Sequence, residues 1–262
     1  MSIRSKIKKE LPWPLLYLYR KFYYLPKDIP MAFNFLSNST KSPTTFSQRF
    51  NLVCQFYRIS YTVDCPHTEN ELINIAKQIL DLGPRVEGVI VEAGAYKGGS
   101  TSKLSLVAKL CNRELMVFDS FEGMPSNDEA HGKSIFGREH HFPKGSHAVP
   151  LDIVKKNIEK YGDINRCQFY KGWLSNTMVN FKKPVAVTCI NVDLVQSTKD
   201  CLKFMYPLIT SGGIIISQDA HFPWIIDLLK DDSFWKNEIG IEKPKMKGLG
   251  TLKYVTIFKN SN

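Results

Sequence analysis

The sequence has no long apolar run and few cysteines, and both facts limit the classes of protein to which it can belong. Its longest apolar segments are much shorter than the roughly 20 residues that cross a bilayer, so no membrane-spanning helix is expected. The six cysteines include no C-x-x-C pair and no spacing typical of a metal site, which favours reduced, mostly buried thiols. No secretory signal is apparent, because the apolar piece 11–19 is short and contains two prolines. These absences favour a cytoplasmic protein.

Acidic residues are scarce near the amino end of a chain whose net charge is +10. Residues 1–27 hold seven lysines and arginines against Glu10 alone, with aromatic residues and leucines between them. A basic, aromatic arm of this kind could lie on an anionic membrane surface or hold a polyanion, and the protein would then be peripheral to the membrane. The alternative is a segment that packs on the body of the protein or on a sister subunit, with its lysines in water. Nucleic acid is the least favoured partner.

Beyond this arm the composition is that of a globular domain. Hydrophobic residues make up 43% of the chain, which is ample for a core. The polar, proline-bearing stretch 37–45 predicts a linker. We therefore expect an arm and linker at 1–45 and a single domain at 46–262.

After residue 84 the pattern alternates between strands and helices, which predicts a parallel sheet with helices on both faces. The expected strands are 88–92, 115–118, 167–171, 186–190 and 213–217. The expected helices are 46–59, 66–82 with Thr68 as its N-cap, and segments near 100–110, 150–161, 197–208 and 222–230. Alternating apolar residues in 251–259 indicate one further strand at the carboxyl end.

The stretch 88–101, G-V-I-V-E-A-G-A-Y-K-G-G-S-T, combines a buried strand, a glycine-rich turn and the start of a helix. Glycines let a ligand approach the backbone, and the free N–H groups of a first helical turn face an anionic group. The spacing G-x-x-x-G-G differs from the dinucleotide fingerprint G-x-G-x-x-G, so NAD is disfavoured. Asp119 ends the second strand, where α/β nucleotide sites hold ribose hydroxyls. The alternative for Asp119 is a carboxylate in an ordinary strand-end turn.

Four runs, in order along the chain, resemble S-adenosylmethionine (SAM) methyltransferases. The first motif of catechol and caffeoyl-CoA O-methyltransferases is similar to E-A-G-A-Y-K-G-G-S from Glu92. The macrocin O-methyltransferase family, which methylates sugar hydroxyls on natural products, resembles the chain in F-D-S-F-E-G-M-P from Phe118, K-G-W-L-S-N-T at 171–177 and D-L-V-Q-S-T at 193–198. The resemblance covers roughly residues 46–235. It implies SAM as cofactor and a Rossmann-like α/β fold, with a mostly parallel seven-stranded sheet, helices on both faces and an antiparallel carboxy-terminal strand.

By this resemblance the glycine turn holds the amino-acid end of SAM, with Ser100 donating to its carboxylate. Asp119 accepts from both ribose hydroxyls, and residues 120–121 and 172–173 border the adenine. The expected cofactor-binding residues are therefore Glu92, Gly94, Ala95, Tyr96, Gly98, Ser100, Asp119, Ser120, Phe121, Gly172 and Trp173. For Trp173 a place among the core aromatics is an equal alternative.

Macrocin-type and catechol-type enzymes use a divalent ion to activate the hydroxyl, held by D-x-D at the fourth strand and D-D at the fifth. The corresponding positions here are Asn191 with Asp193, and Gln218 with Asp219. The metal ligands implied by the resemblance are thus Asn191, Gln218 and Asp219, two amides and one carboxylate. Because Mg²⁺ favours carboxylate oxygens, either the ion binds weakly or it is absent.

Without an ion another base is needed, and the candidates are Asp193 and His221, both at strand ends. The alternatives are that Asp193 caps the following helix and that His221 faces solvent at a helix start. Residues 126–150 form an unusually long loop at this edge and contain four of the six histidines, with spacings that match no common zinc motif. We expect this loop to be a substrate lid, and an ordinary surface loop is the alternative.

The combined pattern favours a SAM-dependent O-methyltransferase that acts on a hydroxyl of a sugar or related small molecule. Two alternatives stay open. The two amides at the expected metal positions favour a catalytically silent SAM-fold binding or scaffold protein, since fold alone does not fix function. The basic arm favours a membrane-surface or polyanion-binding protein, and the N-terminal helices could also mediate a homo-oligomer.

Overall fold

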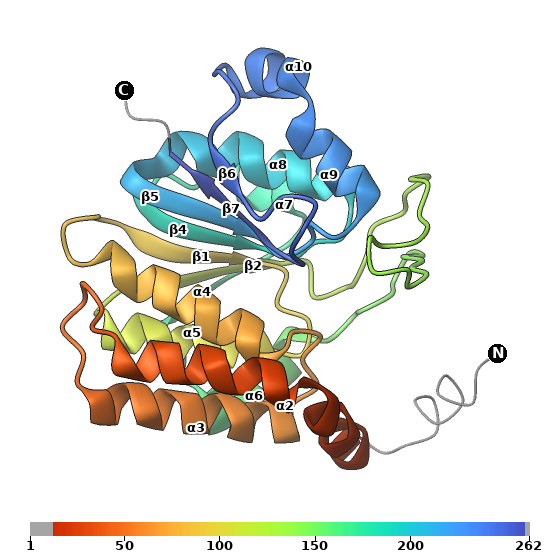
Figure 1. The fold of residues 1–262 in the computed structure, drawn as a ribbon. Helices are drawn as coiled ribbons and strands as arrows, with labels where there is room; N and C mark the ends of the chain where they lie inside the picture. The colour runs from red at the N-terminus through yellow and green to blue at the C-terminus, as the bar shows by residue number, and fades with distance from the viewer. Residues whose placement is uncertain (1–12, 260–262) are drawn as a thin grey trace.

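The computed structural model describes residues 13–259, which form a seven-stranded sheet in the order β3-β2-β1-β4-β5-β7-β6 (Figure 1). The strands are β1 (Val89–Ala93), β2 (Leu115–Asp119), β3 (Cys167–Lys171), β4 (Val185–Ile190), β5 (Ile209–Ser217), β6 (Met246–Lys247) and β7 (Val255–Phe258). The first five strands pair in parallel, whereas β7 runs antiparallel to both β5 and β6. The predicted mostly parallel sheet with an antiparallel carboxy-terminal strand is confirmed.

Helices cover both faces of the sheet (Figure 1). One face carries α2 (Trp13–Ser37), α3 (Phe46–Thr62), α4 (Glu69–Leu82), α5 (Gly99–Leu110) and α6 (Leu151–Tyr161). The other carries α7 (Leu174–Thr177), α8 (Val195–Met205), α9 (Pro223–Lys230) and α10 (Asp232–Phe234). Short helical turns complete the chain at η1 (Ile164–Arg166), η2 (Tyr206–Leu208) and η3 (Trp235–Ile239).

The central strands are apolar throughout because both of their faces are covered. In β2, Met116 and Phe118 join the apolar cluster under α8 and α9, while Leu115 and Val117 join the cluster under α4 and α5. A parallel strand buried on both sides has no polar face, so its sequence reads as a continuous apolar run. This is why the short runs near 90, 117 and 187 predicted strands correctly.

Two helices begin where side chains cap them. Thr68 accepts from the backbone N–H of Glu71, whose carboxylate accepts in return from the Thr68 N–H, and Thr45 makes the same reciprocal pair with Gln48. Each capping box satisfies two backbone donors that a helix start leaves free. The predicted N-cap at Thr68 is confirmed, and α4 starts at Glu69 rather than at 66 because this cap sets the boundary.

Several elements differ from the prediction. The last strand occupies only Val255–Phe258, since residues 251–254 form a turn, and the two-residue strand β6 was not predicted. The 25-residue helix α2 was not predicted either, because it continues through Pro26 and Pro30. Its carboxyl half lies on α3 and α4, where Phe35 is fully buried. Packing of this kind outweighs the intrinsic cost of proline in a helix.

No helix within residues 13–259 is long and apolar enough to cross a membrane. Of the predicted basic arm at 1–27, residues 1–12 lie outside the described residues.

Candidate functional site

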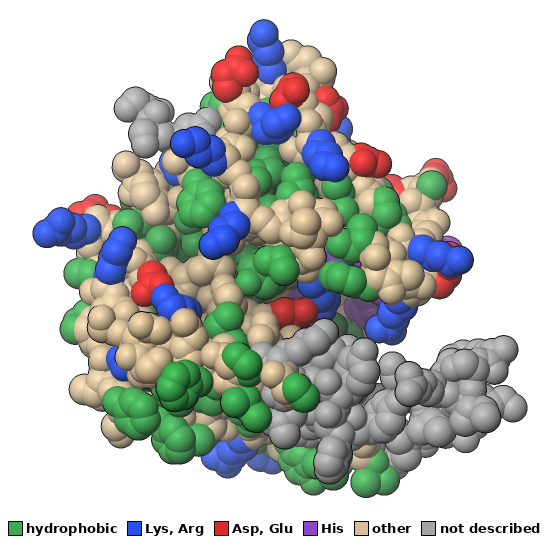
Figure 2. Space-filling model, in the orientation of Figure 1, with side chains coloured by type: hydrophobic (Ala, Val, Ile, Leu, Met, Phe, Trp, Pro, Cys, Tyr) green, Lys and Arg blue, Asp and Glu red, His purple; other side chains and the backbone are tan. Residues whose placement is uncertain are grey.

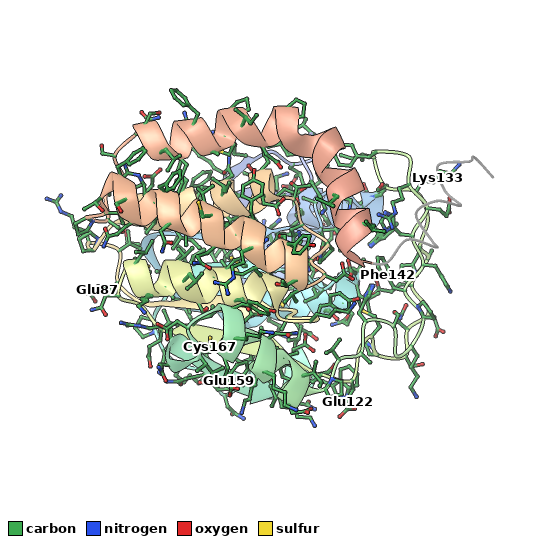
Figure 3. The ribbon with its side chains drawn as sticks, turned by 90° about the horizontal axis from the view of Figure 1, so that it is seen from below. Glu87, Glu122, Lys133, Phe142, Glu159 and Cys167 are labelled. Carbon is green, nitrogen blue, oxygen red and sulfur yellow. The ribbon has the colours of Figure 1, made fainter. Side chains whose placement is uncertain are left out.

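The residues singled out in the sequence meet at the carboxyl ends of β1, β2, β4 and β5, where ligands bind in open α/β sheets. The long loop 126–150 lies at this edge of the sheet (Figure 1). Figure 3 shows Glu122, Lys133 and Phe142 on this side of the molecule and Glu87, which precedes β1, on the opposite side. In Figure 2, histidine side chains are partly visible on this side of the molecule.

Asp119 joins the glycine turn after β1 to the turn after β2. Its Oδ2 accepts from the backbone N–H groups of Ala95 at 2.7 Å and Tyr96 at 3.4 Å, and its Oδ1 accepts from Phe121 at 2.7 Å. The carboxylate therefore holds both turns in place. Three residues predicted to share a cofactor site with Asp119 are brought together by it.

The glycines of the first turn have a different role from the expected one. At Gly94, whose φ is +91°, a Cβ would lie 2.0 Å from the carbonyl oxygen of Asn191, so the glycine admits a neighbouring loop and not a ligand. Gly98 adopts a left-handed conformation as the N-cap of α5 and supplies no side-chain acceptor. The N-cap of α5 therefore makes no side-chain hydrogen bond to the first-turn N–H groups. Binding of an anionic group by these donors stays a prediction.

Replacing Gly94 with alanine is expected to lower the free energy of unfolding by roughly 3 kcal/mol, because a left-handed backbone and a steric clash combine. Gly240 provides the control, since its φ is +81° and no atom lies within 4 Å of the position that an added Cβ would take. Gly240→Ala should cost only about 1 kcal/mol, from the backbone alone. Urea unfolding of both variants measures the difference. Equal losses would show that the Asn191 contact is unimportant.

Glu92 is buried at the start of the glycine turn, with 3% of its surface exposed. Burial raises the pKa of Glu92 to about 7, although hydroxyls of Ser100 and Thr101 oppose the shift. Its Oε2 has no partner in the described part of the chain. A buried, unpaired carboxylate oxygen fits the ammonium group of an amino acid, because a cation there would stabilise the ionised form.

The residues expected around the adenine differ in their exposure and in their hydrogen-bond partners. The Ser120 hydroxyl donates to the Gly123 carbonyl oxygen and accepts from Glu122 N–H, so this side chain stabilises its own turn. Phe121 is buried in the apolar cluster beneath the turn. Trp173 is 38% exposed, which contradicts the core alternative, and Gly172 N–H donates to the Asp119 carbonyl oxygen.

Two carboxyl groups meet at the ends of β4 and β5. Asp219 Oδ2 accepts from the N–H groups of Val192 at 2.8 Å and Asp193 at 3.0 Å, and burial raises the pKa of Asp219 to about 6. Burial and the nearby Asp219 together hold the pKa of Asp193 well above its ordinary range. The prediction that Asp193 could cap α8 is wrong, since Leu194 occupies that position.

His221 lies under the loop and is 6% exposed, so the solvent-facing alternative is wrong. Burial lowers the pKa of His221 to about 3, with Lys253 and His140 adding to the shift. Its ring lies 3.9 Å from the Phe222 ring, and its Nδ1 has no partner among the described residues. An imidazole with so low a pKa stays neutral near pH 7 and is a weak base.

The donor set at the expected metal positions does not fit a resident Mg²⁺ ion. It offers the two amides of Asn191 and Gln218 and the single carboxylate of Asp219, and amide oxygens compensate poorly for lost charge. Within residues 13–259, no group of three or more histidine, cysteine or acidic side chains could hold a metal. Gln218 Oε1 and Asp219 Oδ1 are buried without partners in the described chain, and such acceptors suit a hydroxyl donor.

The loop 126–150 is anchored over the strand ends by its own contacts. Glu129 accepts from two N–H groups at the start of α8, and Ile135 N–H donates to the His221 carbonyl oxygen at 2.9 Å. Further along, His140 packs edge-on against Phe222 at 4.8 Å, and His147 Nδ1 lies 3.9 Å from Asp193 Oδ2. The loop is therefore part of the site.

Strained backbone gathers at the same place. The non-glycine residues with left-handed φ within 13–259 are Tyr96, Asn112, Phe121, His147 and Asp193. All but Asn112 border the site, since Tyr96 and Phe121 donate to Asp119, His147 faces Asp193, and the Tyr96 and His147 rings lie 5.4 Å apart. Each such residue costs about 1–3 kcal/mol, and strain of this kind is typical of functional sites.

A charged group beside His221 had no signal in the sequence. Lys253 Nζ lies 3.2 Å from Glu71 Oε2 and donates to the Pro66 carbonyl oxygen at 3.1 Å. Burial would raise the pKa of Glu71, but Lys253 and His67 outweigh it and lower the pKa to about 2. Lys253 reaches the site because β7 pairs antiparallel with β5, with Val255 opposite Ser217, and that register could not be inferred beforehand.

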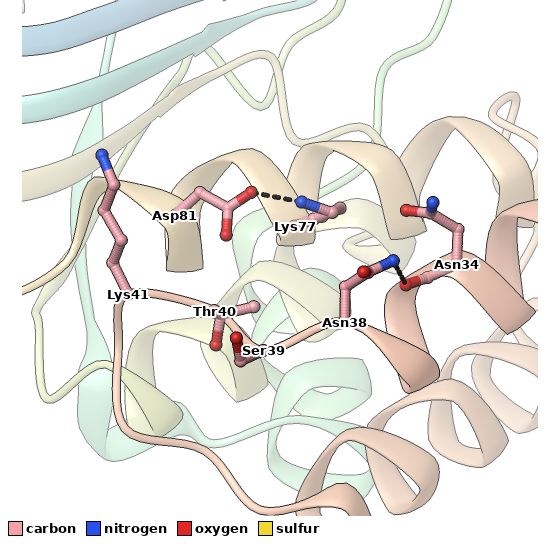
Figure 4. A pocket seen from close by; sticks show the side chains of 7 residues that line it. All are labelled: Asn34, Asn38, Ser39, Thr40, Lys41, Lys77 and Asp81. Carbon is pink, nitrogen blue, oxygen red and sulfur yellow. Dashed lines mark hydrogen bonds and ion pairs between the residues drawn. The ribbon is translucent and has the colours of Figure 1, made fainter.

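A polar groove of about 680 Å³ lies away from these strand ends, beside the carboxyl half of α4 (Figure 4). It is lined by Asn34, Asn38, Ser39, Thr40, Lys41, Lys77 and Asp81. Its lining has a single carboxylate, Asp81, and no histidine, so it lacks the paired carboxyl groups found at the sheet edge.

Comparison with protein families gives a match to macrocin-O-methyltransferase (TylF) over residues 55–247. A similar curated protein is 8-demethyl-8-(2,3-dimethoxy-alpha-L-rhamnosyl)-tetracenomycin-C 4'-O-methyltransferase of Streptomyces olivaceus, 32% identical over 62% of this chain and 63% of its own. Mycinamicin III 3''-O-methyltransferase of Micromonospora griseorubida is 28% identical over 53% of this chain and 57% of its own. The chain thus spans about three fifths of the length of these relatives.

Solved structures share the fold. The O-methyltransferase NovP has a TM-score of 0.64 at 22% identity, covering 82% of this chain and all of its own. The calicheamicin methyltransferase CalS11 has a TM-score of 0.57 at 16% identity, covering 90% of this chain and 93% of its own. At these identities the likeness concerns the fold alone.

Proposed function

The chain belongs to the macrocin O-methyltransferase family, and on this premise we propose that it transfers a methyl group from SAM to a hydroxyl of a sugar or related small molecule. The relatives named above are O-methyltransferases whose names specify a rhamnosyl-tetracenomycin and mycinamicin III. The fold is shared with NovP. Sugar hydroxyls are therefore the acceptor class that we propose.

The observation that carries the proposal is the pairing of two unlike half-sites at one sheet edge. One half has an uncapped helix start, a buried Glu92 carboxylate and Asp119, which suits the charged and ribose parts of SAM. The other half has two neighbouring carboxyl groups of raised pKa, Asp193 and Asp219, which suits proton removal from a hydroxyl. Their joint presence supports a group transfer between two bound substrates.

When bound, SAM supplies an electrophilic methyl group on sulfonium. Glu92, Asp119 and the start of α5 would hold SAM, and Asp193 would accept the proton that the acceptor hydroxyl gives up. The unpartnered oxygens of Gln218 and Asp219 orient the acceptor through its hydroxyl groups. The aromatic rings of the loop and of Phe222 exclude water from the reacting atoms.

Removal of metal ions is expected to change the rate little. With two amides at the positions implied for metal, the activity in EDTA should stay within about twofold of that with added Mg²⁺, because the donor set holds the ion too weakly to be resident. Initial rates in both buffers measure this. A large loss in EDTA that Mg²⁺ restores would contradict the non-metal mechanism.

The direct test is a methyl-transfer assay. The protein is incubated with methyl-labelled SAM and a panel of free sugars, nucleotide-linked deoxysugars and glycosylated natural products, and the label is followed into the acceptor. We expect incorporation at a sugar hydroxyl in at least one class. S-adenosylhomocysteine (SAH) binding in calorimetry, measured in parallel, reports on the cofactor half alone.

A second candidate is a catalytically silent SAM-fold protein, favoured by Asn191 and Gln218. It predicts that SAH binds while no acceptor in any class is methylated. It also predicts that Asp193→Asn leaves the Kd for SAH unchanged.

The exposed apolar surface of α2 and α3 is a candidate contact site for a larger partner. Apolar side chains are exposed along α2 and α3, among them Phe33 at 71% and Phe46 at 59%, and Figure 2 shows apolar surface over these helices. Such a face suits a second copy of the chain or, with the basic residues 1–27, a peripheral contact with an anionic membrane. Sedimentation and liposome flotation of the full chain separate the two.

A further inference from the structure

One carboxylate of the loop 126–150 is bound to the backbone of the acceptor half-site. Glu129 Oε2 accepts from Val195 N–H at 2.6 Å, and Glu129 Oε1 accepts from Gln196 N–H at 2.9 Å. Both donors belong to the first turn of α8. The contact spans 66 positions of sequence, so it is a tertiary contact and not a local turn.

Glu129 replaces a cap that α8 lacks. The N-cap of this 11-residue helix is Leu194, which has no side-chain acceptor, so the first-turn donors would otherwise be unpaired. A carboxylate at a helix N-terminus gains from both the hydrogen bonds and the helix dipole. Two bonds from one carboxylate also fix its orientation, and they hold this part of the loop against α8.

The capped helix begins two residues after Asp193. The backbone of Asp193 is left-handed, with φ of 61°, and its N–H is held by Asp219 on the other side. Segment 192–196 is thus fixed between two carboxylates, one from the end of β5 and one from the loop. The other end of the loop supplies His147, 3.9 Å from Asp193 Oδ2.

We propose that Glu129 is a positioning residue, which couples closure of the loop over the acceptor to the placement of the Asp193 carboxyl. The inference rests on the proposed methyl transfer and adds a specific role for the loop in it. Loop closure and base placement are then one event, because the same two hydrogen bonds stabilise both. The contacts of Asp119 involve neither the loop nor α8. The loop meets the cofactor half only at its other end, where the His147 and Tyr96 rings lie 5.4 Å apart, so the Glu129 contact itself does not reach the cofactor site.

The acceptor side of the contact is tested with Glu129→Gln. The amide keeps the shape but places an NH₂ group against a helix N–H donor, so at least one bond is lost along with the charge. We expect hydrogen exchange of residues 126–150 to become faster and kcat/KM for the sugar acceptor to fall about tenfold. The Kd for SAH should stay within about twofold of that of the wild type.

The donor side is tested with Val195→Pro, which removes the N–H of the shorter bond. Proline is favourable at the first position of a helix, and Leu194 already has the extended backbone, φ −99° and ψ 145°, that precedes proline. The helix should therefore form normally. The two substitutions remove the same bond, so the double variant should lose much less than the sum of the two single effects.

Asp128→Asn is the matched control, because Asp128 is the exposed neighbour and the change of charge is the same. Its loop exchange and kinetics should equal those of the wild type. The proposal is overturned if Glu129→Gln behaves like Asp128→Asn in both measurements, or if SAH affinity falls as much as acceptor kcat/KM. If loop exchange becomes faster in Glu129→Gln but the protein methylates no acceptor, the loop contact is confirmed and the proposed methyl transfer is wrong.

Discussion

Asp193→Asn is expected to reduce kcat about 10³-fold while leaving the Kd for SAH unchanged. The substitution keeps the size of the side chain but removes the group that accepts the hydroxyl proton, and a positioned base contributes roughly 10²–10⁴ in rate. Single-turnover measurements with saturating SAM isolate the chemical step. The matched comparison is His221→Gln, which should lower kcat less than about tenfold, because the pKa of about 3 makes His221 a weak base.

The pH dependence of the methyl-transfer rate tests independently whether Asp193 is the base. A base acts only when it is ionised, and burial together with Asp219 raises the pKa of Asp193, so the rate should fall as the pH drops through that raised pKa. Since the pKa of the neighbouring Asp219 is about 6, the acidic limb should lie well above the ordinary range of an aspartate. A flat profile from about pH 5 to about pH 8, or an Asp193→Asn variant with normal kcat, would exclude Asp193 as the base.

Asp119→Ala is expected to weaken SAH binding about a hundredfold. Alanine removes the acceptor expected for the ribose hydroxyls, and it also releases the N–H groups of Ala95, Tyr96 and Phe121 that fix both turns. Calorimetric titration of SAH measures the effect. Binding at normal affinity would end the ribose assignment.

Asp119→Asn separates the two losses. The amide oxygen retains one acceptor for the backbone, so the turns should hold better, whereas the charge-assisted bonds to ribose are lost. We expect an intermediate Kd and a thermal midpoint closer to that of the wild type than the alanine variant gives. Parallel falls in stability and affinity across the two variants would show that Asp119 acts only through the fold.

The order and type of the central elements were predictable because their cause is local. Parallel strands buried on both faces give short apolar runs, and the helices between them carry the period of 3.6 residues, so β1 to β5 were placed within a few residues. The family resemblance is confirmed by the match over residues 55–247. The helix α2 could not be predicted, because tertiary packing of residues such as Phe35 stabilises a proline-containing segment.

The candidate site was predictable only in part, for a related reason. Asp119, Glu92 and Asp193 stand at strand ends, and topology brings strand ends together whatever the loops do. Glu129 and Lys253 reach the same place through a long irregular loop and an antiparallel pairing, which leave no spacing signal in the sequence. The low pKa of His221 depends on burial under that loop, so its chemistry could not be assigned beforehand.

The contact of Gly94 with the Asn191 carbonyl bears on the thermodynamic linkage between the two substrates. It packs the cofactor turn directly on the segment that leads to Asp193, so neither can shift without the other. A displacement of one segment is therefore passed to the other, so this contact gives cofactor and acceptor a route to a coupling free energy, by which each changes the affinity of the other by the same factor. The loop offers a second route, since His147 lies against both the Tyr96 ring and the Asp193 carboxyl.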